Sequence, residues 1–153
     1  MVLDDSLRIL KQFAIHEVDY VLVGGVALNV HGIARATEDM DVFVDPRVEN
    51  VVRLRQALKS LYNDSDIDEI RAEDLSGAYP TIRYTPPSGA LYLDILSRLG
   101  SFAAFEDLAA EEKEWRGVTV RVATPATLYW LKKDTVRMID KADTEALKRK
   151  FDL

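Results

Sequence analysis

The chain has 153 residues, of which 48% are hydrophobic and 30% are charged, a composition typical of a soluble globular protein. Its net charge of −6 argues against a broad nucleic-acid-binding surface, because such surfaces are usually strongly basic. Cysteine is absent, which excludes disulfides and thiolate metal sites. We expect a single domain over residues 1–153, with a core over about 1–123 and C-terminal helices over about 124–153. Because neither a signal peptide nor a membrane-spanning apolar run is evident, a cytoplasmic location is expected.

The first half of the chain is expected to alternate short helices and strands, because its apolar residues change between helical and alternating spacing. Gly24 and Gly25 directly follow a short apolar strand, and Gly32 stands where glycine commonly ends a helix. His31, just before that glycine, is interpreted as a helix C-terminal residue in preference to a metal ligand. The expected elements are a helix over residues 4–16, a strand over 18–23, a short helix over 26–31 and a strand over 38–44.

The second half adds further strands and ends in helices. Thr124 followed by Pro125 is a typical helix start, with the threonine as the cap and the proline in the first turn. Together these elements indicate an α/β (α+β) fold with a mixed β-sheet of about five strands flanked by helices. The expected elements are a helix over 46–62, a polar loop over 63–77, a strand near 80–84, a turn at 86–89, a strand over 90–96, a helix over 102–110, a strand over 117–122, a helix from 125 and a last helix from about 140.

Three aspartates stand on two of the predicted strands. Asp39 and Asp41 are two residues apart, so in an extended segment they point to the same face of a sheet, with Cα atoms roughly 6–7 Å apart. Asp94 lies among apolar residues in a strand, where aspartate is a poor strand former and needs a reason. Carboxylate oxygens suit Mg²⁺ or Mn²⁺, which can be shared with substrate phosphates. The alternative is that Asp39 and Asp41 are solvent-facing residues of an edge strand.

The glycine pair ahead of a helix offers bare backbone N–H groups to a phosphate. Combined with the aspartates, it describes a place for a nucleoside triphosphate and its metal ion. A second reading of the D-x-D pair is a metal-dependent glycosyltransferase that binds a nucleotide-sugar diphosphate. The glycines so close upstream and the short chain count against that reading.

Two runs carry a resemblance to a known family: GGVALNVHGIARATEDMDVFV near the start and TLYWLKKDTVRMIDKADTEAL near the end. The first resembles the glycine and acidic motif of the nucleotidyltransferase superfamily typified by DNA polymerase β. Within it, the chain is most similar to the AbiEii-like toxin-type nucleotidyltransferases. The second run resembles that family's lysine helix and trailing motif, from which Met138 and Ile139 depart. The resemblance implies a polymerase β-like fold and an active enzyme.

The resemblance also implies roles for individual residues. Gly24 and Gly25 would hold the triphosphate, and Asp39, Asp41 and Asp94 would bind the metal. Asp94 is in addition a candidate base for the incoming hydroxyl. Lys132 would neutralise phosphate charge, unless its stem only packs over the sheet or Lys133 takes the role.

Four further residues are candidates for the site, and three of them have two readings. Arg35 and Thr37 flank the acidic pair and are candidates for phosphate binding, while Arg35 is equally a candidate ion-pair partner of Glu38 or Asp39. Asp140 and Asp143, near Arg137 in the trailing motif, would orient Lys132 or cap the last helix.

The expected activity is transfer of a nucleoside monophosphate from a nucleoside triphosphate such as ATP to a hydroxyl, with pyrophosphate leaving. The resemblance favours an RNA acceptor such as tRNA, then a protein side chain, then a small molecule, and implies a cognate antitoxin as a partner. The locally basic C-terminal segment is a candidate surface for RNA. The alternative is a catalytically silent nucleotide-binding or antitoxin-type module.

Overall fold

The computed structural model describes residues 2–77, 81–89, 91–99, 102–132 and 138–153. Within them, six strands form one mixed sheet in the order β3-β4-β2-β1-β8-β7, and β5 and β6 form a small separate ribbon. The strands are β1 (Tyr20–Val23), β2 (Asp39–Val44), β3 (Thr81–Tyr84), β4 (Tyr92–Leu96), β5 (Arg98–Leu99), β6 (Ala103–Ala104), β7 (Ala110–Trp115) and β8 (Val118–Ala123). The helices are α1 (Val2–Ile15), α2 (Gly24–Val30), α3 (Val48–Lys59), α4 (Ala72–Leu75), α5 (Pro125–Lys132) and α6 (Met138–Phe151), with short 3₁₀ segments over Ser65–Glu69 and Phe105–Asp107. The mixed sheet with flanking helices confirms the predicted fold class.

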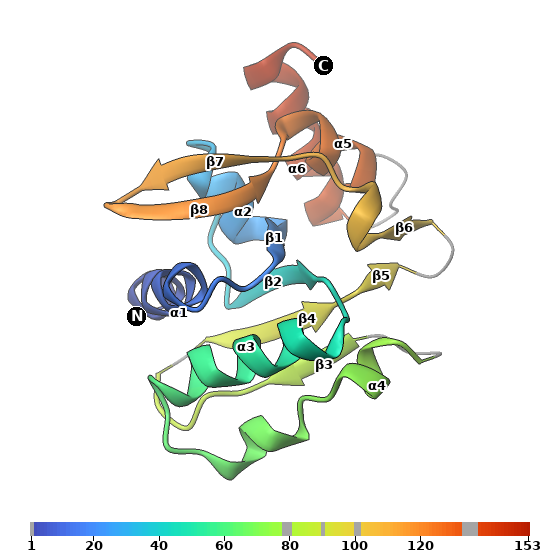
Figure 1. Cartoon of the computed structure of the whole chain (residues 1–153). Coiled ribbons are helices and arrows are strands. Elements are labelled where there is room, and N and C mark those ends of the chain that lie inside the picture. The colour runs from blue at the N-terminus through green and yellow to red at the C-terminus, as the bar shows by residue number, and fades with distance from the viewer. Residues whose placement is uncertain (1, 78–80, 90, 100–101, 133–137) are drawn as a thin grey trace.

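The centre of the sheet mixes strand directions. β1 and β2 are antiparallel, joined through the short helix α2, whereas β2 and β4 are parallel, joined by the longer crossover that contains α3. β1 also pairs in parallel with β8 from the end of the domain core. Parallel neighbours need such long crossovers, which is why strands far apart in the sequence become adjacent here. As a result β2 and β4 lie side by side at the middle of the sheet (Figure 1).

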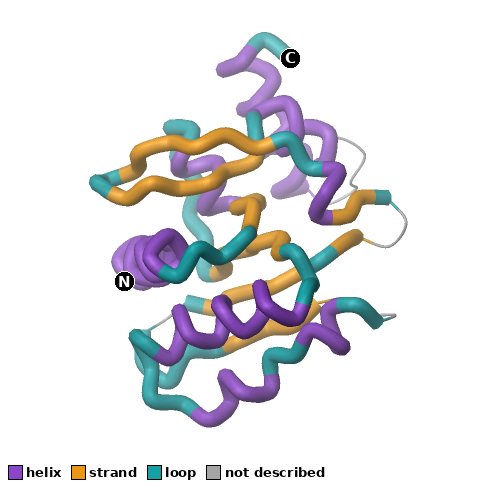
Figure 2. Tube along the Cα trace, in the orientation of Figure 1, coloured by secondary structure: helices purple, strands orange, loops and turns teal. Residues whose placement is uncertain are grey.

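Helices lie around the sheet, as the tube in Figure 2 shows. α1 and α3 pack against each other and contribute Phe13 and Leu54 to the buried core. In β2, Met40 and Val42 are fully buried, while the alternate residues Asp39 and Asp41 are only half-buried. The alternation predicted for β2 is therefore correct at these positions, and the aspartates lie on the opposite face of the strand from Met40 and Val42.

The predicted helix over 102–110 is wrong. That stretch contains the ribbon strand β6, a single 3₁₀ turn and the start of β7. In the 3₁₀ turn, the Asp107 carboxylate accepts a hydrogen bond from the backbone N–H of Ala104 at 2.9 Å. β7 itself, AEEKEW, was not predicted, because glutamate and lysine are weak strand formers. Pairing with β8 along its whole length overrides that local preference. Its charges suit an edge strand, where they oppose pairing with other chains.

The polar segment over 63–77 is more ordered than predicted. It contains a 3₁₀ segment, whose first turn is capped by Asp64, and the short helix α4. Ile67, Ile70 and Leu75 anchor it in the core. Widely spaced apolar residues in a polar stretch gave no periodic signal, so this structure escaped sequence reasoning. Among the described residues, no helix combines the length and apolar character needed to span a bilayer.

Candidate active site

The three predicted aspartates come together on neighbouring strands. Asp41 of β2 lies directly opposite Asp94 of β4, and Asp39 precedes Asp41 by two residues on the same face. Each offers a carboxylate oxygen, and these three oxygens lie within 4.8 Å of one another. All three residues are half-buried, and β2 lies between β4 and β1, which excludes the alternative of an edge strand. The cluster depends on the parallel pairing of β2 with β4.

The Asp41 carboxyl bears the strongest electrostatic strain in the cluster. Its pKa is raised to about 7, first by burial, then by repulsion from Asp94 and a hydrogen bond with the Asp94 side chain, and then by repulsion from Asp39. The positive charge of Lys132 acts in the opposite direction and lowers the pKa. A group in this position takes up a proton or gains a cation. The three aspartates offer hard oxygen ligands close together and carry negative charge that the protein neutralises poorly at Asp41. Such a set fits a divalent cation such as Mg²⁺ or Mn²⁺.

Arg83 of β3 is a site residue that sequence reasoning missed. Its Nε lies 2.8 Å from Asp94 Oδ1 and its Nη2 lies 3.0 Å from Asp94 Oδ2, a bidentate pair, and Nη2 is also 3.5 Å from Asp39 Oδ2. The hydrogen bonds to Asp94 raise the pKa of the guanidinium. Arg83 stands opposite Asp94 in the antiparallel β3–β4 pair. The sequence predicted a turn at 86–89, but the register of the β3–β4 pair, which decides this pairing, could not be obtained from the sequence.

The two glycines make room for the site. Helix α2 begins at Gly24, two residues earlier than predicted, and Gly24 has φ +74°. A side chain on Gly24 would collide with the Asp41 carboxylate, whereas one on Gly25 would crowd Arg35 and Thr37. The pair therefore allows close approach of side chains, in addition to the phosphate binding for which it is a candidate.

Thr37 and Arg35 are both held by protein contacts. The Thr37 hydroxyl donates to the Asp39 carbonyl at 2.9 Å and accepts the Asp39 N–H at 3.2 Å, so it fixes the start of β2. Arg35 Nε lies 3.4 Å from Asp143 Oδ1. Among the described residues no ion pair joins Arg35 to Glu38 or Asp39, so the predicted pairing is wrong. Asp143, far along the chain in α6, is its acidic partner.

Lys132 ends helix α5 and meets the same aspartate. Its Nζ lies 3.3 Å from Asp143 Oδ2, and Asp143 is only 4% exposed. Of the two readings of Asp143, the structure favours orientation of Lys132 over capping of the last helix. The α5 cap is as predicted, since Thr124 Oγ1 accepts the Thr127 N–H at 3.2 Å. Lys133, Arg137 and the Asp140 side chain lie outside the described residues.

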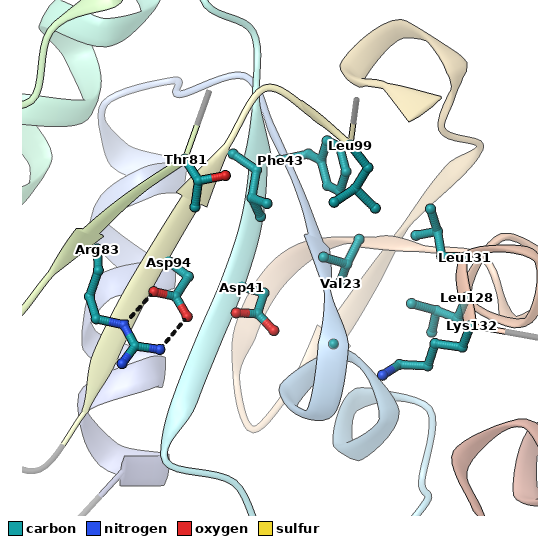
Figure 3. Close-up of a pocket in the computed structure, with 12 residues that line it drawn as sticks. Val23, Asp41, Phe43, Thr81, Arg83, Asp94, Leu99, Leu128, Leu131 and Lys132 are labelled. Carbon is teal, nitrogen blue, oxygen red and sulfur yellow. Dashed lines mark hydrogen bonds and ion pairs between the residues drawn. The ribbon is translucent and has the colours of Figure 1, made fainter. Parts of the chain in front are cut away.

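Asp41, Asp94 and Lys132 line one cavity of about 580 Å³. Figure 3 shows Asp94 and Asp41 side by side, Arg83 on the outer side of Asp94, and Lys132 on the opposite side of the cavity from Arg83. Apart from Thr81, the rest of the wall is apolar and is formed by Val23, Phe43, Leu96, Leu99, Leu128 and Leu131. A cavity lined by charged residues at one end and apolar residues at the other suits a ligand with a phosphate part and a ring part.

His31 does not belong to this cluster. It follows the last residue of α2, and its Nε2 lies 2.8 Å from the Ala123 carbonyl oxygen. Burial lowers the pKa of its imidazole. The prediction of a helix-terminal histidine is therefore confirmed.

Comparison with known proteins points to one enzyme class. The family described as "Nucleotidyl transferase AbiEii toxin, Type IV TA system" matches residues 8–144. A comparison with curated proteins gives no match. Among solved structures, the lincosamide antibiotic adenylyltransferase LnuA bound to lincomycin is similar, with 16% identity, TM-score 0.62 and 95% of each chain covered.

Two further structures share the fold. One is ANT(2")-Ia in complex with adenylyl-2"-tobramycin, with 12% identity, TM-score 0.56, and 94% of this chain and 86% of that chain covered. The other is an antigenic nucleotidyltransferase-like protein from Paracoccidioides brasiliensis, with 15% identity, TM-score 0.56, and 95% and 75% covered. At such identities the likeness concerns the fold. The family match also sets aside the glycosyltransferase reading of the aspartate pair.

Proposed function

Because this chain belongs to the AbiEii family of nucleotidyltransferases, we propose that its three-aspartate cluster is the metal-binding active site of that activity. The observation that carries the proposal is the meeting of Asp39, Asp41 and Asp94, with oxygens within 4.8 Å, beside a cavity that Asp41, Asp94 and Lys132 line. The reaction is transfer of a nucleoside monophosphate from a nucleoside triphosphate to a hydroxyl of the acceptor.

Asp39, Asp41 and Asp94 would hold Mg²⁺ or Mn²⁺. A divalent cation bound there would polarise phosphate oxygens and lower the pKa of the attacking hydroxyl. The bare N–H groups of Gly24 and Gly25 would bind the triphosphate. Arg35 and Thr37, which are engaged with Asp143 and with the backbone, would support the walls of this cradle more than contact phosphate directly.

The covalent step is a displacement at the α-phosphorus. The acceptor oxygen forms a bond to that phosphorus, its proton passes to the Asp94 carboxylate, and the bond from the α-phosphorus to the bridging oxygen breaks. Pyrophosphate leaves with that oxygen. Lys132 would neutralise the charge that develops on the phosphates, and its ion pair with the buried Asp143 would fix the position of the ammonium group.

RNA is the acceptor that we favour. Four basic side chains of α6 are exposed at the C-terminal end of the fold, and the match to a toxin family favours a cellular macromolecule over a metabolite. Phosphate contacts by such side chains would position an RNA end near the cavity. The residues are Lys141, Lys148, Arg149 and Lys150. A protein hydroxyl is the second candidate, and small molecules follow, as LnuA and ANT(2")-Ia suggest by their bound ligands.

The test is a labelling experiment. Purified protein with Mg²⁺ and each α-labelled nucleoside triphosphate is incubated with total RNA or total protein from cells. We expect label in RNA, no label with Asp41→Asn, and no label with wild-type protein in EDTA. The same result for wild type and Asp41→Asn, or labelling that persists in EDTA, would contradict the proposed site.

A charge reversal in α6 tests the acceptor. Lys148→Glu combined with Arg149→Glu is expected to raise the KM for RNA by about tenfold and to leave the KM for the nucleotide nearly unchanged, because phosphate contacts act mainly on RNA affinity. The control reverses Lys11 and Lys59, two exposed lysines on α1 and α3. Growth arrest on expression in cells, absent with Asp41→Asn and relieved by the product of a neighbouring gene, would support a toxin with its antitoxin.

A further inference from the structure

We propose that Arg83 is a positioning residue that competes with the divalent cation for Asp94 and Asp39. On this view the guanidinium is the protein's own counter-cation in the empty site, and it sets how tightly the site binds a free metal ion. The inference rests on the proposed function, because it assumes that the three aspartates bind metal. It adds a residue that neither the family motif nor the sequence analysis contains.

The contacts of Arg83 are those of a cation within the site. Its forked guanidinium meets both oxygens of Asp94 at 2.8 and 3.0 Å, and its Nη2 reaches Asp39 at 3.5 Å. Bidentate arginine–carboxylate pairs of this kind are among the strongest charge-assisted hydrogen bonds. A metal ion that uses the same carboxylate oxygens must share them or displace the guanidinium.

Arg83 can withdraw without disrupting the core. β3 is the edge of the sheet, and the Arg83 side chain is 53% exposed. The guanidinium also lies over the Tyr92 ring, 4.9 Å from its centroid, which holds it close to the aspartates. An exposed arginine held by two carboxylates and one ring can move between them and solvent more readily than a buried one.

The pairing divides the three carboxylates unequally. Asp94 and Asp39 have Arg83 as a counter-cation, whereas Asp41, deeper in the cavity wall beside Gly24, has no ion pair with Arg83. An entering metal therefore gains Asp41 without displacing Arg83 and competes for the other two. Free metal would bind weakly for this reason. A metal that arrives with a nucleoside triphosphate brings its own phosphate ligands and is less affected.

The experiment measures metal affinity without nucleotide. Binding of Mn²⁺ to the metal-free protein is followed by the loss of the electron paramagnetic resonance signal of free Mn²⁺. Arg83→Gln is expected to bind Mn²⁺ about three- to tenfold more tightly than wild type, which corresponds to loss of one competing ion pair. Arg83→Lys keeps the charge but loses the fork, so its affinity is expected to fall between the two.

Arg47 supplies the matched control. It is 51% exposed, and it pairs with Asp19 and Asp45 at 2.8 Å each, near the opposite end of β2 from Asp39. Arg47→Gln removes the same charge from the molecule and is expected to change Mn²⁺ affinity less than twofold. With a non-hydrolysable nucleoside triphosphate present, the difference in Mn²⁺ affinity between wild type and Arg83→Gln is expected to become smaller.

The outcomes separate this inference from the proposed function. Saturable Mn²⁺ binding by wild type that is unchanged or weakened in Arg83→Gln would overturn the competition and leave the metal site intact. An equal gain in Arg83→Gln and Arg47→Gln would also overturn it, because general charge would explain the effect. If neither wild type nor Arg83→Gln binds Mn²⁺, the proposed metal site fails, and the inference fails with it. Thermal unfolding in EDTA verifies that each variant is folded.

Discussion

The Asp41 carboxylate combines burial with repulsion from two neighbouring carboxylates, and this shapes the chemistry of the site at the scale of single residues. The guanidinium of Arg83 forms two hydrogen bonds with Asp94, so of the two facing aspartates, Asp94 has this arginine as a counter-cation and Asp41 does not. Such an arrangement is unfavourable for the empty protein and favourable for cation binding. Strain of this kind is common where function requires a destabilised group.

Stability of the metal-free protein is expected to depend on pH through Asp41. Its pKa is raised from 3.8 to about 7 by burial and by its carboxylate neighbours, so the folded state holds a proton that the unfolded state has released between about pH 4 and 7. The free energy of unfolding in EDTA should therefore fall as pH rises through this range and level off above it. Urea unfolding at several pH values measures this.

Asp41→Asn is the control for that prediction. It keeps the shape and removes the charge, so the unfolding free energy in EDTA should be higher than that of wild type at pH 8 and should vary less between pH 4 and 7. A parallel fall in wild type and Asp41→Asn would show that other groups are responsible. Activity should be lost in this variant.

Gly24→Ala is expected to destabilise the protein by about 2–4 kcal/mol and to reduce activity more than tenfold. Two causes act together: a positive φ that suits glycine, and a collision of the new methyl group with the Asp41 carboxylate. Gly117→Ala provides a close match, because Gly117 has φ +82° and open space where the new methyl group would stand. It should cost only about 1 kcal/mol. Equal losses in the two variants, measured by urea unfolding, would contradict the role assigned to the Asp41 contact.

At the scale of elements, the charged residues that line the cavity are carried by one helix and three strands. α5 carries Lys132 at its last turn and is started by the Thr124 cap. β2 and β4 carry the aspartates, and β3 carries Arg83. Errors of prediction also fall at this scale. Strand β7, which is rich in glutamate, has weak local strand preference, and it is a strand because it pairs with β8 along its whole length.

Thr124→Ala is expected to reduce stability by about 1 kcal/mol and to raise the KM for nucleotide a fewfold. The Thr124 hydroxyl satisfies an N–H of the first turn of α5, and a frayed start would loosen the helix that holds Lys132. Thr144→Ala, which removes a hydroxyl that donates to the Lys141 carbonyl on α6, is the comparison. Urea unfolding and steady-state kinetics measure both variants. A normal KM in Thr124→Ala would show that α5 is fixed by packing alone.

Across the whole molecule, one buried aspartate joins three segments. Asp143 in α6 forms ion pairs with Arg35, which follows α2, and with Lys132 in α5. Segments from the first quarter and from the end of the chain thus meet on one carboxylate, next to a lysine that lines the cavity. Burial makes this cluster costly to break, since removal of one partner leaves the others without compensation.

Asp143→Asn is expected to destabilise the protein by about 3 kcal/mol and to lower kcat more than it raises the KM for nucleotide. The change leaves two cations close together and releases Lys132 from its fixed position. Lys132→Met combined with Asp143→Leu and Arg35→Met should recover most of the stability but none of the activity. Recovery of activity in the triple variant would exclude a role for Lys132 in the reaction.

The sequence alone determined the chemistry of the site but not its completeness. The aspartates, the glycine pair, the helix caps and the alternation of β2 depend on short-range rules, so Asp39, Asp41 and Asp94 could be picked out from local patterns, whereas Lys132 was indicated by the family resemblance. Arg83, the pairing of Arg35 with Asp143, and the strand β7 depend on register and on contacts between distant segments. Only the tertiary structure decided these, because strand register and ion-pair choice arise from packing across the sheet and not from neighbouring residues.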